Sequence, residues 1–335
     1  MKLSYDQIKS VIQGAVYFSE EEKGLQPHRM NKEEEALYIP TKFKDKAFAS
    51  SNIQSVFKTD SDKLILKADI AIGSSRSYFC FDVYIDGQFT AEFKNFEHKN
   101  MTLPYTKIDC PLGDFSWELP LEKGEKEIRI VFPFGSRVII SEFSLENATY
   151  IEPVKRSKTM LIYGDSITQG YDALNPSRAY AVKLADTLDA EAFSKAIGGE
   201  IFNPSLAAIK NDIKPDYITV AYGTNDWSFC TKEEFNDNCK GFYENVKKNY
   251  PDAKLFAITP IWRKTMHNEV AYGLFEDIGK TIHSICEEIG GITVIDGFEF
   301  VPQEPTLFAD LSLHPSNEGF DHYIKNLTEE IRKYI

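Results

Sequence analysis

The stretch Met160-Leu161-Ile162-Tyr163-Gly164-Asp165-Ser166-Ile167-Thr168 decides how the second half of this chain folds. Four apolar residues are followed at once by a glycine, an acidic residue and a serine. The apolar run predicts a buried strand, and Gly164 lets the backbone turn and pack closely where that strand ends. We therefore expect Ser166 at the carboxyl edge of a sheet, at the start of a helix or loop.

Strand-like and helix-like segments alternate through the rest of this half. The apolar runs are Thr159–Tyr163, Tyr217–Ala221, Leu255–Ile258 and Ile292–Ile295, with a shorter candidate at Ala192–Lys195. Amphipathic helices are expected near Arg178–Leu188, Lys232–Asn249, Glu269–Ile289 and Ser316–Ile335. This alternation predicts an α/β fold, in which helices cover both faces of a parallel sheet and ligands bind at the carboxyl ends of the strands.

The first half is composed of short β segments. Candidate strands are Leu64–Ile70, Tyr78–Ile85, Gln88–Phe93, Glu127–Phe132 and Arg137–Leu145, and the Asp86-Gly87 pair predicts a tight hairpin between the second and third. Short strands separated by turns favour a β-sandwich. We expect a short helix within residues 1–15 and a solvated face at Glu33-Glu34-Glu35. The polar stretch Glu152–Lys158 is the expected linker, so the predicted domains are residues 1–152 and 157–335.

Composition narrows the class of partner and the compartment. The formal net charge is −13, from 51 acidic and 38 basic residues, which disfavours binding to nucleic acid or to an anionic membrane surface. The five cysteines are scattered, and the amino-terminal stretch has no apolar signal segment. These features predict a cytoplasmic protein with reduced thiols, no membrane span and no metal site. The oligomeric state is left open.

Four positions that could take part in catalysis each follow a predicted β segment. They are Ser166, the Gly198-Gly199 pair, Asn225 in Gly223-Thr224-Asn225-Asp226, and His314 in Asp310-Leu311-Ser312-Leu313-His314-Pro315. A serine hydroxyl becomes a nucleophile when a base accepts its proton, and amide N–H groups stabilise an oxyanion. Taken singly, each position is more often a turn or a helix cap.

Taken together, their order resembles the conserved blocks of the SGNH (GDSL-like) hydrolase superfamily. Gly164-Asp165-Ser166-Ile167-Thr168 is similar to the first block, and Gly223-Thr224-Asn225-Asp226 is similar to the third. Gly199 is similar to the glycine of the second block, with Gly198 as the alternative register. His314-Pro315 is similar to the last block. The resemblance covers residues 157–335. It implies a flavodoxin-like domain, Ser166 as nucleophile, His314 as base, and an oxyanion hole formed by Ser166, Gly199 and Asn225. It implies no cofactor.

One position departs from the family pattern. The family usually has an Asp three residues before the His, where this chain has Leu311, and the nearest carboxylate is Asp310. Either the loop bulges by one residue and Asp310 still orients His314, or the enzyme uses a Ser–His dyad. Loss of the acid slows such an enzyme without changing its reaction class.

The β-rich first half bears on the substrate. A β-sandwich, here of expected jelly-roll-like form, followed by such a hydrolase domain is similar to the layout of two-domain carbohydrate esterases. This implies an O-acetylesterase acting on acetylated mono- or oligosaccharides, with Asp165, Trp227 and Trp262 as candidate substrate contacts. The alternatives are a general short-chain acyl esterase or lysophospholipase-like enzyme, a carbohydrate-binding protein without activity, and a transferase using the same acyl-enzyme.

Overall fold

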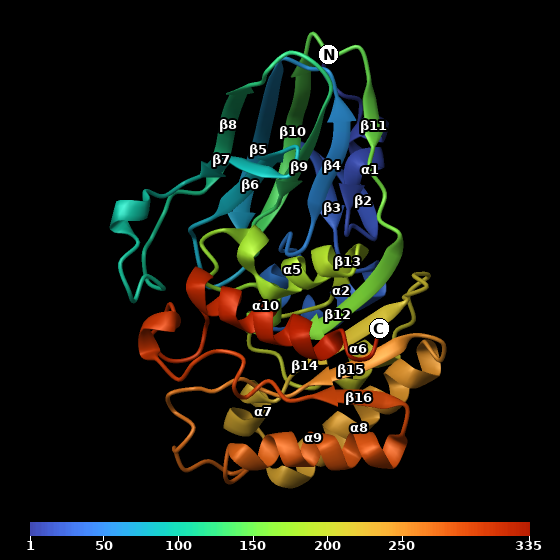
Figure 1. The fold of residues 1–335 in the computed structure, drawn as a ribbon, viewed down its shortest axis with the longest axis vertical. Helices are drawn as coiled ribbons and strands as arrows, with labels where there is room; N and C mark the ends of the chain where they lie inside the picture. Colours follow the sequence, from blue (N-terminus) through green and yellow to red (C-terminus); the bar gives the residue numbers. More distant parts are fainter.

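A computed structural model describes all 335 residues. The chain forms two antiparallel sheets within residues 12–153 and one parallel sheet after residue 157 (Figure 1). The β-rich half lies above the parallel sheet in that view, and the ion pair between Arg129 and Asp186 links it to the helix Tyr180–Thr187.

The two antiparallel sheets pack face to face about one apolar core, an arrangement that fits a β-sandwich. One sheet holds β1 (Ile12–Gln13), β4 (Gln54–Thr59), β9 (Lys126–Val131), β6 (Cys80–Ile85) and β7 (Gln88–Lys94), with β11 (Ile151–Pro153) beside β4. The other holds β2 (Tyr17–Glu21), β3 (Gly24–His28), β10 (Ser136–Glu146), β5 (Lys63–Ile72) and β8 (Gly113–Pro120). The expected jelly-roll-like connectivity stays a prediction.

The hairpin expected at Asp86-Gly87 is confirmed. Asp86 and Gly87 have φ angles of 49° and 76°, and they join β6 to β7 as an antiparallel pair. Positive φ at both central residues is what a two-residue turn needs to follow the twist of its strands, and glycine adopts it at no steric cost.

The parallel sheet has the strand order β13-β12-β14-β15-β16, the doubly wound order in which the first strand lies between the second and the third. Its strands are β12 (Lys158–Gly164), β13 (Ala190–Ser194), β14 (Tyr217–Ala221), β15 (Lys254–Ile258) and β16 (Ile292–Ile295), close to the predicted runs. All four neighbouring pairs are parallel, so their carboxyl ends meet at one edge.

Helices cover both faces of this sheet. α5 (Tyr180–Thr187) packs on α10 (Asn317–Ile331) on the side of the β-rich half, and α8 (Lys232–Asn249) packs on α9 (Glu276–Ile289) and α6 (Pro204–Ala208) on the other (Figure 1). The remaining helices are α1 (Tyr5–Val11), α2 (Lys32–Tyr38), α3 (Lys44–Ala47), α4 (Ser166–Gln169) and α7 (Thr224–Phe229). α9 begins seven residues later than predicted, after Gly273, whose φ of 110° interrupts a helix.

The two halves share part of one apolar core. Met30, Tyr38 and Ala47, on the segment around α2 and α3, belong to the same buried cluster as Leu161 of β12 and Phe256 of β15. β11 ends at Pro153 and β12 begins at Lys158, but the division of the chain into two domains at this point stays a prediction.

The solvated face predicted for Glu33-Glu34-Glu35 is wrong for Glu34 and Glu35, which are buried, whereas Glu33 is exposed. The Glu34 side chain is fully buried, and its Oε2 atom accepts a hydrogen bond from Lys195 Nζ at 2.6 Å. Its other oxygen accepts from the side-chain amide of Asn211 at 2.8 Å. The first turn of α2 points at the end of β13, and burial is tolerated because each charge has a partner.

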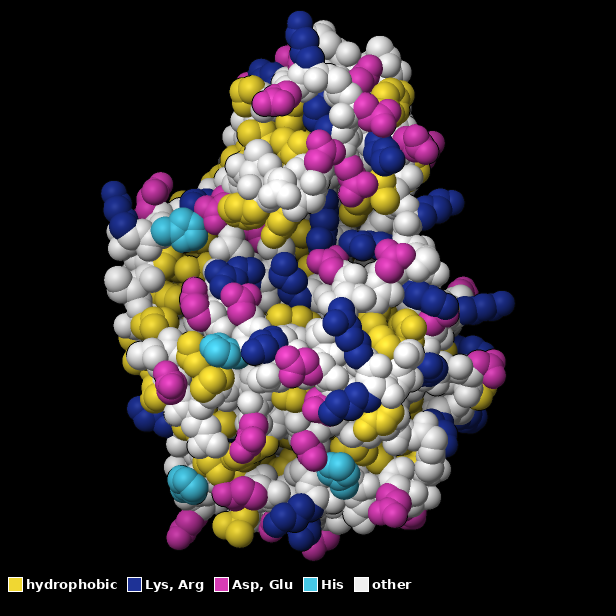
Figure 2. Space-filling view, in the orientation of Figure 1, with side chains coloured by type: hydrophobic (Ala, Val, Ile, Leu, Met, Phe, Trp, Pro, Cys, Tyr) yellow, Lys and Arg dark blue, Asp and Glu magenta, His cyan; other side chains and the backbone are white.

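On the face shown in Figure 2, basic and acidic side chains are interspersed, without a large area of one sign. Among the helices, none combines the length and the apolar composition needed to span a bilayer.

Replacing Lys195 by Met leaves the buried Glu34 carboxylate without its cation. We expect the free energy of unfolding, measured by urea titration at neutral pH, to fall by about 3–5 kcal/mol. The matched control is Lys240→Met, which breaks an exposed pair with Glu288 and should cost less than about 1 kcal/mol. Equal losses in the two variants would refute a structural role for the buried pair.

Candidate active site

The three strands β13, β12 and β14 are neighbours, and each is followed in the chain by one of the residues expected in the site. Ser166 begins α4 two residues after β12, Gly199 follows β13, and Asn225 lies in the first turn of α7 after β14. Asp165 caps α4, since its Oδ1 atom accepts from the Ile167 N–H at 2.9 Å. The parallel sheet therefore brings these residues to one edge, as the sequence predicts.

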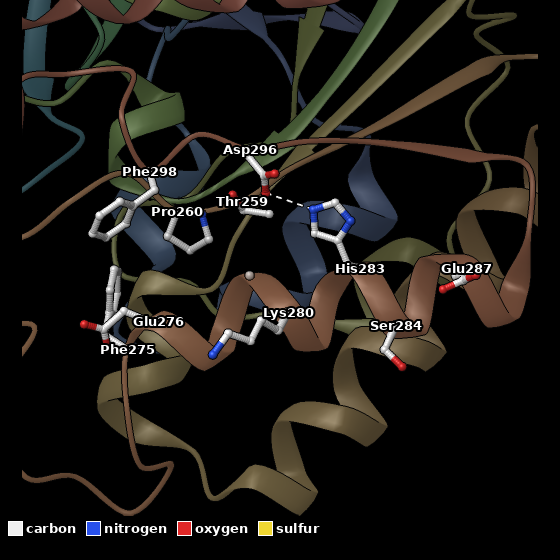
Figure 3. A pocket seen from close by; sticks show the side chains of 11 residues that line it. Thr259, Pro260, Phe275, Glu276, Lys280, His283, Ser284, Glu287, Asp296 and Phe298 are labelled. Atoms are coloured by element: carbon white, nitrogen blue, oxygen red, sulfur yellow. Dashed lines mark hydrogen bonds and ion pairs between the residues drawn. The ribbon is translucent and has the colours of Figure 1, made fainter.

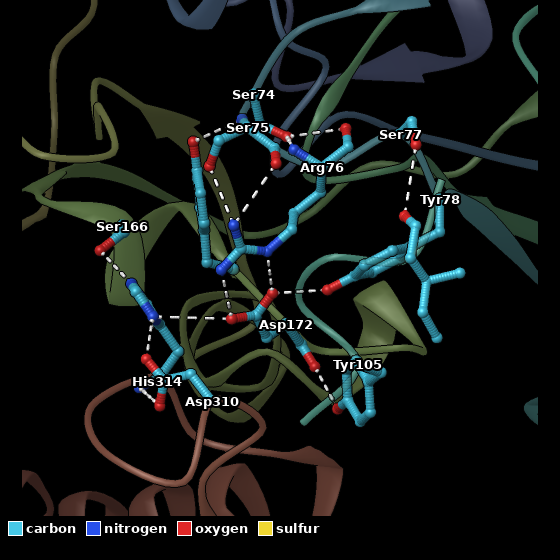
Figure 4. A network of polar contacts seen from close by, with 12 residues as sticks. Ser74, Ser75, Arg76, Ser77, Tyr78, Tyr105, Ser166, Asp172, Asp310 and His314 are labelled. Carbon is cyan, nitrogen blue, oxygen red and sulfur yellow. Dashed lines mark hydrogen bonds and ion pairs between the residues drawn. The ribbon is translucent and has the colours of Figure 1, made fainter. Parts of the chain in front are cut away.

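A continuous chain of hydrogen bonds links Asp310, His314 and Ser166. His314 Nε2 lies 2.8 Å from Ser166 Oγ, and His314 Nδ1 lies 2.8 Å from Asp310 Oδ2 (Figure 4). With Nδ1 protonated, the imidazole donates to the carboxylate and its Nε2 atom is free to accept the serine proton. The three side chains thus have the geometry of a nucleophile, a base and a group that orients the base.

Asp310 reaches His314 because the loop contains a bulge at Leu311. Leu311 has a φ of 60°, which is uncommon for a residue other than glycine. Asp310 Oδ1 accepts from the backbone N–H groups of Ser312, Leu313 and His314 at 2.8, 2.7 and 3.1 Å. Burial raises the pKa of the Asp310 carboxyl, but the His314 contact and these N–H groups outweigh it and hold that pKa well below its usual range.

Gly199 is better placed than Gly198 to donate to an oxyanion. The Gly198 N–H donates to Gln169 Oε1 at 2.8 Å, and its carbonyl accepts from Lys46 Nζ. The Gly199 N–H has no partner within the protein, and the φ of 87° at Gly199 turns the chain there. Asn225 donates one amide hydrogen to the Glu200 carbonyl at 3.0 Å, which orients the side chain and leaves its second hydrogen free.

Comparison with known sequences and structures identifies this region. Residues 162–322 match the sequence model of the GDSL-like Lipase/Acylhydrolase family. This part of the chain is a GDSL-like lipase/acylhydrolase domain. Among curated protein sequences, none is significantly similar to this chain.

Solved structures resemble the whole chain, including the β-rich half. A GDSL-like lipase from Bacteroides ovatus is 18% identical, with a TM-score of 0.78 over 99% of this chain and 97% of its own. The salicylyl-acyltransferase SsfX3 from a tetracycline biosynthetic pathway is 19% identical, with a TM-score of 0.76 over 96% and 94%. A family two carbohydrate esterase from Clostridium thermocellum, solved with cellohexaose, is 17% identical, with a TM-score of 0.67 over 96% and 98%. At these identities the likeness shows the fold.

The three residues expected to contact substrate are all buried in the GDSL-like domain. Trp227 is 1% exposed, and its indole N–H donates to the Gly273 carbonyl at 2.9 Å. Trp262 is 8% exposed and packs on Phe308. Both rings therefore belong to the core and are not free to stack on a sugar, which corrects the prediction. Asp165 is 3% exposed and acts as a helix cap.

Sequence reasoning missed a second carboxylate beside the histidine. Asp172 is fully buried, and its Oδ2 atom lies 3.6 Å from His314 Nδ1. Tyr171 stacks on the His314 ring, with the two centroids 5.6 Å apart. The only sequence signal was an acidic residue six positions after Ser166, and no local pattern distinguishes such a residue from an ordinary turn aspartate.

One group of side chains has the composition of a metal site. Cys80, Asp82 and Glu92 place their ligand atoms within 4.8 Å of one another. Their oxygens are already engaged: Asp82 accepts from Asn175 and from the Ser177 N–H, and Glu92 accepts from Lys94, His98 and Asn175. These contacts join β6 and β7 to the loop that follows α4, which is a structural role.

Replacing Asp310 by Asn tests the contacts of this carboxylate through the pH dependence of stability. Its folded pKa is below the value of about 3.9 for an unfolded Asp, so its stabilisation is present above that pH and lost as the pH falls below it. We expect the wild-type advantage in unfolding free energy over Asp310→Asn to shrink by about 1–2 kcal/mol between pH 6 and pH 3.

Urea titrations of both proteins at each pH measure this difference. The Asp165 and Glu200 carboxyls, whose pKa values burial raises to about 6 and about 7, are present in both proteins and cancel. A wild-type advantage that stays constant or grows toward pH 3 would contradict the assignment.

Proposed function

We propose that this protein is a serine esterase that hydrolyses short-chain esters, chiefly acetyl esters, through an acyl-enzyme on Ser166. The observation that carries the proposal is the hydrogen-bonded series Asp310–His314–Ser166, located at the carboxyl edge of the sheet beside Gly199 and Asn225. This constellation is suited to nucleophilic attack on a carbonyl and to little else.

In the proposed mechanism, His314 Nε2 takes the hydroxyl proton as Ser166 Oγ attacks the ester carbonyl. The N–H groups of Ser166 and Gly199 and the Asn225 amide stabilise the oxyanion of the tetrahedral intermediate. Protonated His314 then gives the proton to the departing alcohol, and the acyl-enzyme remains. His314 next deprotonates a water molecule that attacks this ester, which releases the acid and restores Ser166.

Two cavities of the GDSL-like domain lie apart from the nucleophile. The hollow bordered by Asp165, Ile167 and Thr168 measures about 20 Å³, and its lining includes neither Ser166 nor His314. A much larger polar groove of about 530 Å³ lies along α9, between Phe275, His283 and Asp296, and includes neither Ser166 nor His314 (Figure 3). Neither cavity therefore defines the acyl-binding space, and the preference for acetyl esters rests on the likeness of the whole chain to an acetyl xylan esterase.

The proposal that the substrate is a carbohydrate ester is supported by the fold of the whole chain, in which a β-rich half precedes the GDSL-like domain. Family two carbohydrate esterases share it, and so does an acetyl xylan esterase from Butyrivibrio proteoclasticus, with a TM-score of 0.63 over 99% of this chain. We propose O-acetyl groups of mono- or oligosaccharides as the substrate. The five unpaired cysteines favour the cytoplasm as its compartment.

A second candidate is acyl transfer, favoured by the full-length likeness to the salicylyl-acyltransferase. The same acyl-enzyme serves both reactions, since an alcohol can attack it in place of water. The catalytic set does not distinguish the two, so the acceptor has to be tested directly.

Replacing Ser166 by Ala removes the nucleophile. We expect hydrolysis of p-nitrophenyl acetate to fall by at least about a thousandfold in kcat, and the wild type to prefer acetate over butyrate and octanoate. The matched control is Ser284→Ala. Ser284 lies on α9 next to His283, which pairs with Asp296 away from Ser166, so this substitution should leave the rate unchanged. Wild-type protein inactive on every ester would refute the esterase proposal.

The substrate class is tested with acetylated sugars. We expect wild-type protein to release acetate from acetylated xylo- or cello-oligosaccharides with a higher kcat/KM than from p-nitrophenyl acetate, because contacts to the sugar contribute to transition-state binding. Mass spectrometry of the same mixtures with an unacetylated sugar added would detect transfer. Ester hydrolysis with no sugar deacetylation would favour the general short-chain esterase, and sugar binding without hydrolysis would favour the inactive binding protein.

A further inference from the structure

The loop that follows the nucleophile helix carries Asp172 into the space beside the catalytic histidine. α4 ends at Gly170 in a left-handed conformation, and Asp172 itself has a φ of 68°. A non-glycine residue keeps such a conformation when its surroundings determine it strongly. The Asp172 side chain has no solvent exposure, and its Oδ2 atom faces His314 Nδ1 at 3.6 Å.

The partners of the Asp172 carboxylate come from the β-rich half. Arg76 forms two parallel bonds to it, from Nε to Oδ1 at 2.6 Å and from Nη2 to Oδ2 at 3.0 Å. The Tyr78 hydroxyl donates to Oδ1 at 2.5 Å, and the Tyr105 hydroxyl donates to the Asp172 carbonyl at 2.8 Å. Figure 4 shows these side chains converging on Asp172 from the side opposite His314. A bidentate guanidinium fixes both the position and the plane of a carboxylate.

We propose that Asp172 is a positioning residue for His314, a second carboxylate at Nδ1 that the β-rich half holds in place through Arg76 and Tyr78. The inference rests on the proposed function, because it concerns the same histidine. Asp310 accepts the Nδ1–H hydrogen bond, and Asp172 places a fixed negative charge beside it. The imidazole is thereby kept with Nε2 toward Ser166, and the imidazolium formed during the reaction is stabilised by two carboxylates instead of one.

Several other groups face the imidazole and complete its electrostatic surroundings. The Tyr171 ring stacks on the His314 ring. The Arg76 guanidinium lies over the Tyr171 ring, with its central carbon 5.5 Å from the ring centroid. The charge of His314 also acts on the buried Asp165 carboxyl, whose pKa it lowers in part against the larger effect of burial. Arg76 offsets part of the negative charge of Asp172. Removing the Asp172 charge therefore makes the electrostatic potential at His314 more positive, and removing the Arg76 charge makes it more negative.

The test compares Asp172→Asn, Arg76→Met and a matched control, Arg129→Met. Arg129 also links the two halves, by an ion pair with Asp186, and its side chain is 16% exposed against 12% for Arg76, but it does not contact the His314 network. Kinetics on p-nitrophenyl acetate give kcat, KM and the pH profile, and thermal unfolding checks that each variant is folded. Tyr78→Phe, which keeps both charges and removes one hydrogen bond, is the milder variant if Asp172→Asn does not fold.

We expect Asp172→Asn and Arg76→Met each to lower kcat by about tenfold to a hundredfold with little change in KM, the effect of losing a group that orients a functional histidine. The acid limb of the pH–rate profile should move to lower pH by about one unit in Asp172→Asn and to higher pH in Arg76→Met. Tyr78→Phe should give a smaller loss of kcat. Arg129→Met should change neither kcat nor the limb. Opposite movements are not expected from a purely structural defect.

A second measurement does not depend on activity. The ring signals of His314, assigned with a His314→Gln variant, are titrated by NMR in wild type, Asp172→Asn and Arg76→Met, and their midpoints should move in the same opposite directions. If wild-type protein hydrolyses no ester but these midpoints move as stated, the proposed function fails and the contact stands. Unchanged midpoints and a wild-type pH profile in folded Asp172→Asn would overturn the positioning role.

Discussion

A carboxylate without solvent exposure is costly unless a cation and hydrogen-bond donors meet it, and Asp172 is in that situation beside His314. Arg76 and Tyr78 satisfy it, but both come from the β-rich half of the chain. The loop after the nucleophile helix is therefore held by side chains from the other half of the chain. The geometry of the His314 ring depends in turn on that loop.

The other loops of the site are held in the same way. Lys46 in the first half donates a hydrogen bond to the Gly198 carbonyl, next to the proposed oxyanion donor Gly199. Arg29, also in the first half, donates to the Ser194 carbonyl at the end of β13. The fully buried pair between Glu34 and Lys195 lies between these contacts. The β-rich half is thus joined to the catalytic edge by buried polar contacts, which require matched geometry and disfavour sliding of one half on the other.

The sequence was most informative where function follows from a local pattern. Ser166 and Asn225 each lie in a short motif after an apolar run, so the runs and the strand–helix alternation predicted them at one edge of the sheet. Asp172 and Arg76 could not be paired in this way, because they are 96 positions apart and neither has a distinctive neighbour. Glu34 was misjudged for the same reason: its partner Lys195 is distant in sequence, and an unpaired acidic run is normally solvated. Trp227 was misjudged because sequence does not tell a core aromatic from a binding one.

Asp310 shows that the contact between the acid and the histidine does not depend on one fixed spacing in the sequence. The usual spacing of three residues fails here, yet Asp310 reaches Nδ1 of His314 from four residues away. The extra residue, Leu311, is accommodated in the left-handed region, which costs roughly 1–2 kcal/mol for a side chain with a Cβ. Three backbone N–H groups that converge on Asp310 Oδ1 offset this cost and rigidify the bulge. What the chemistry requires is a carboxylate oxygen at one nitrogen of the imidazole, and a loop of different length meets that requirement when its own backbone binds the acid.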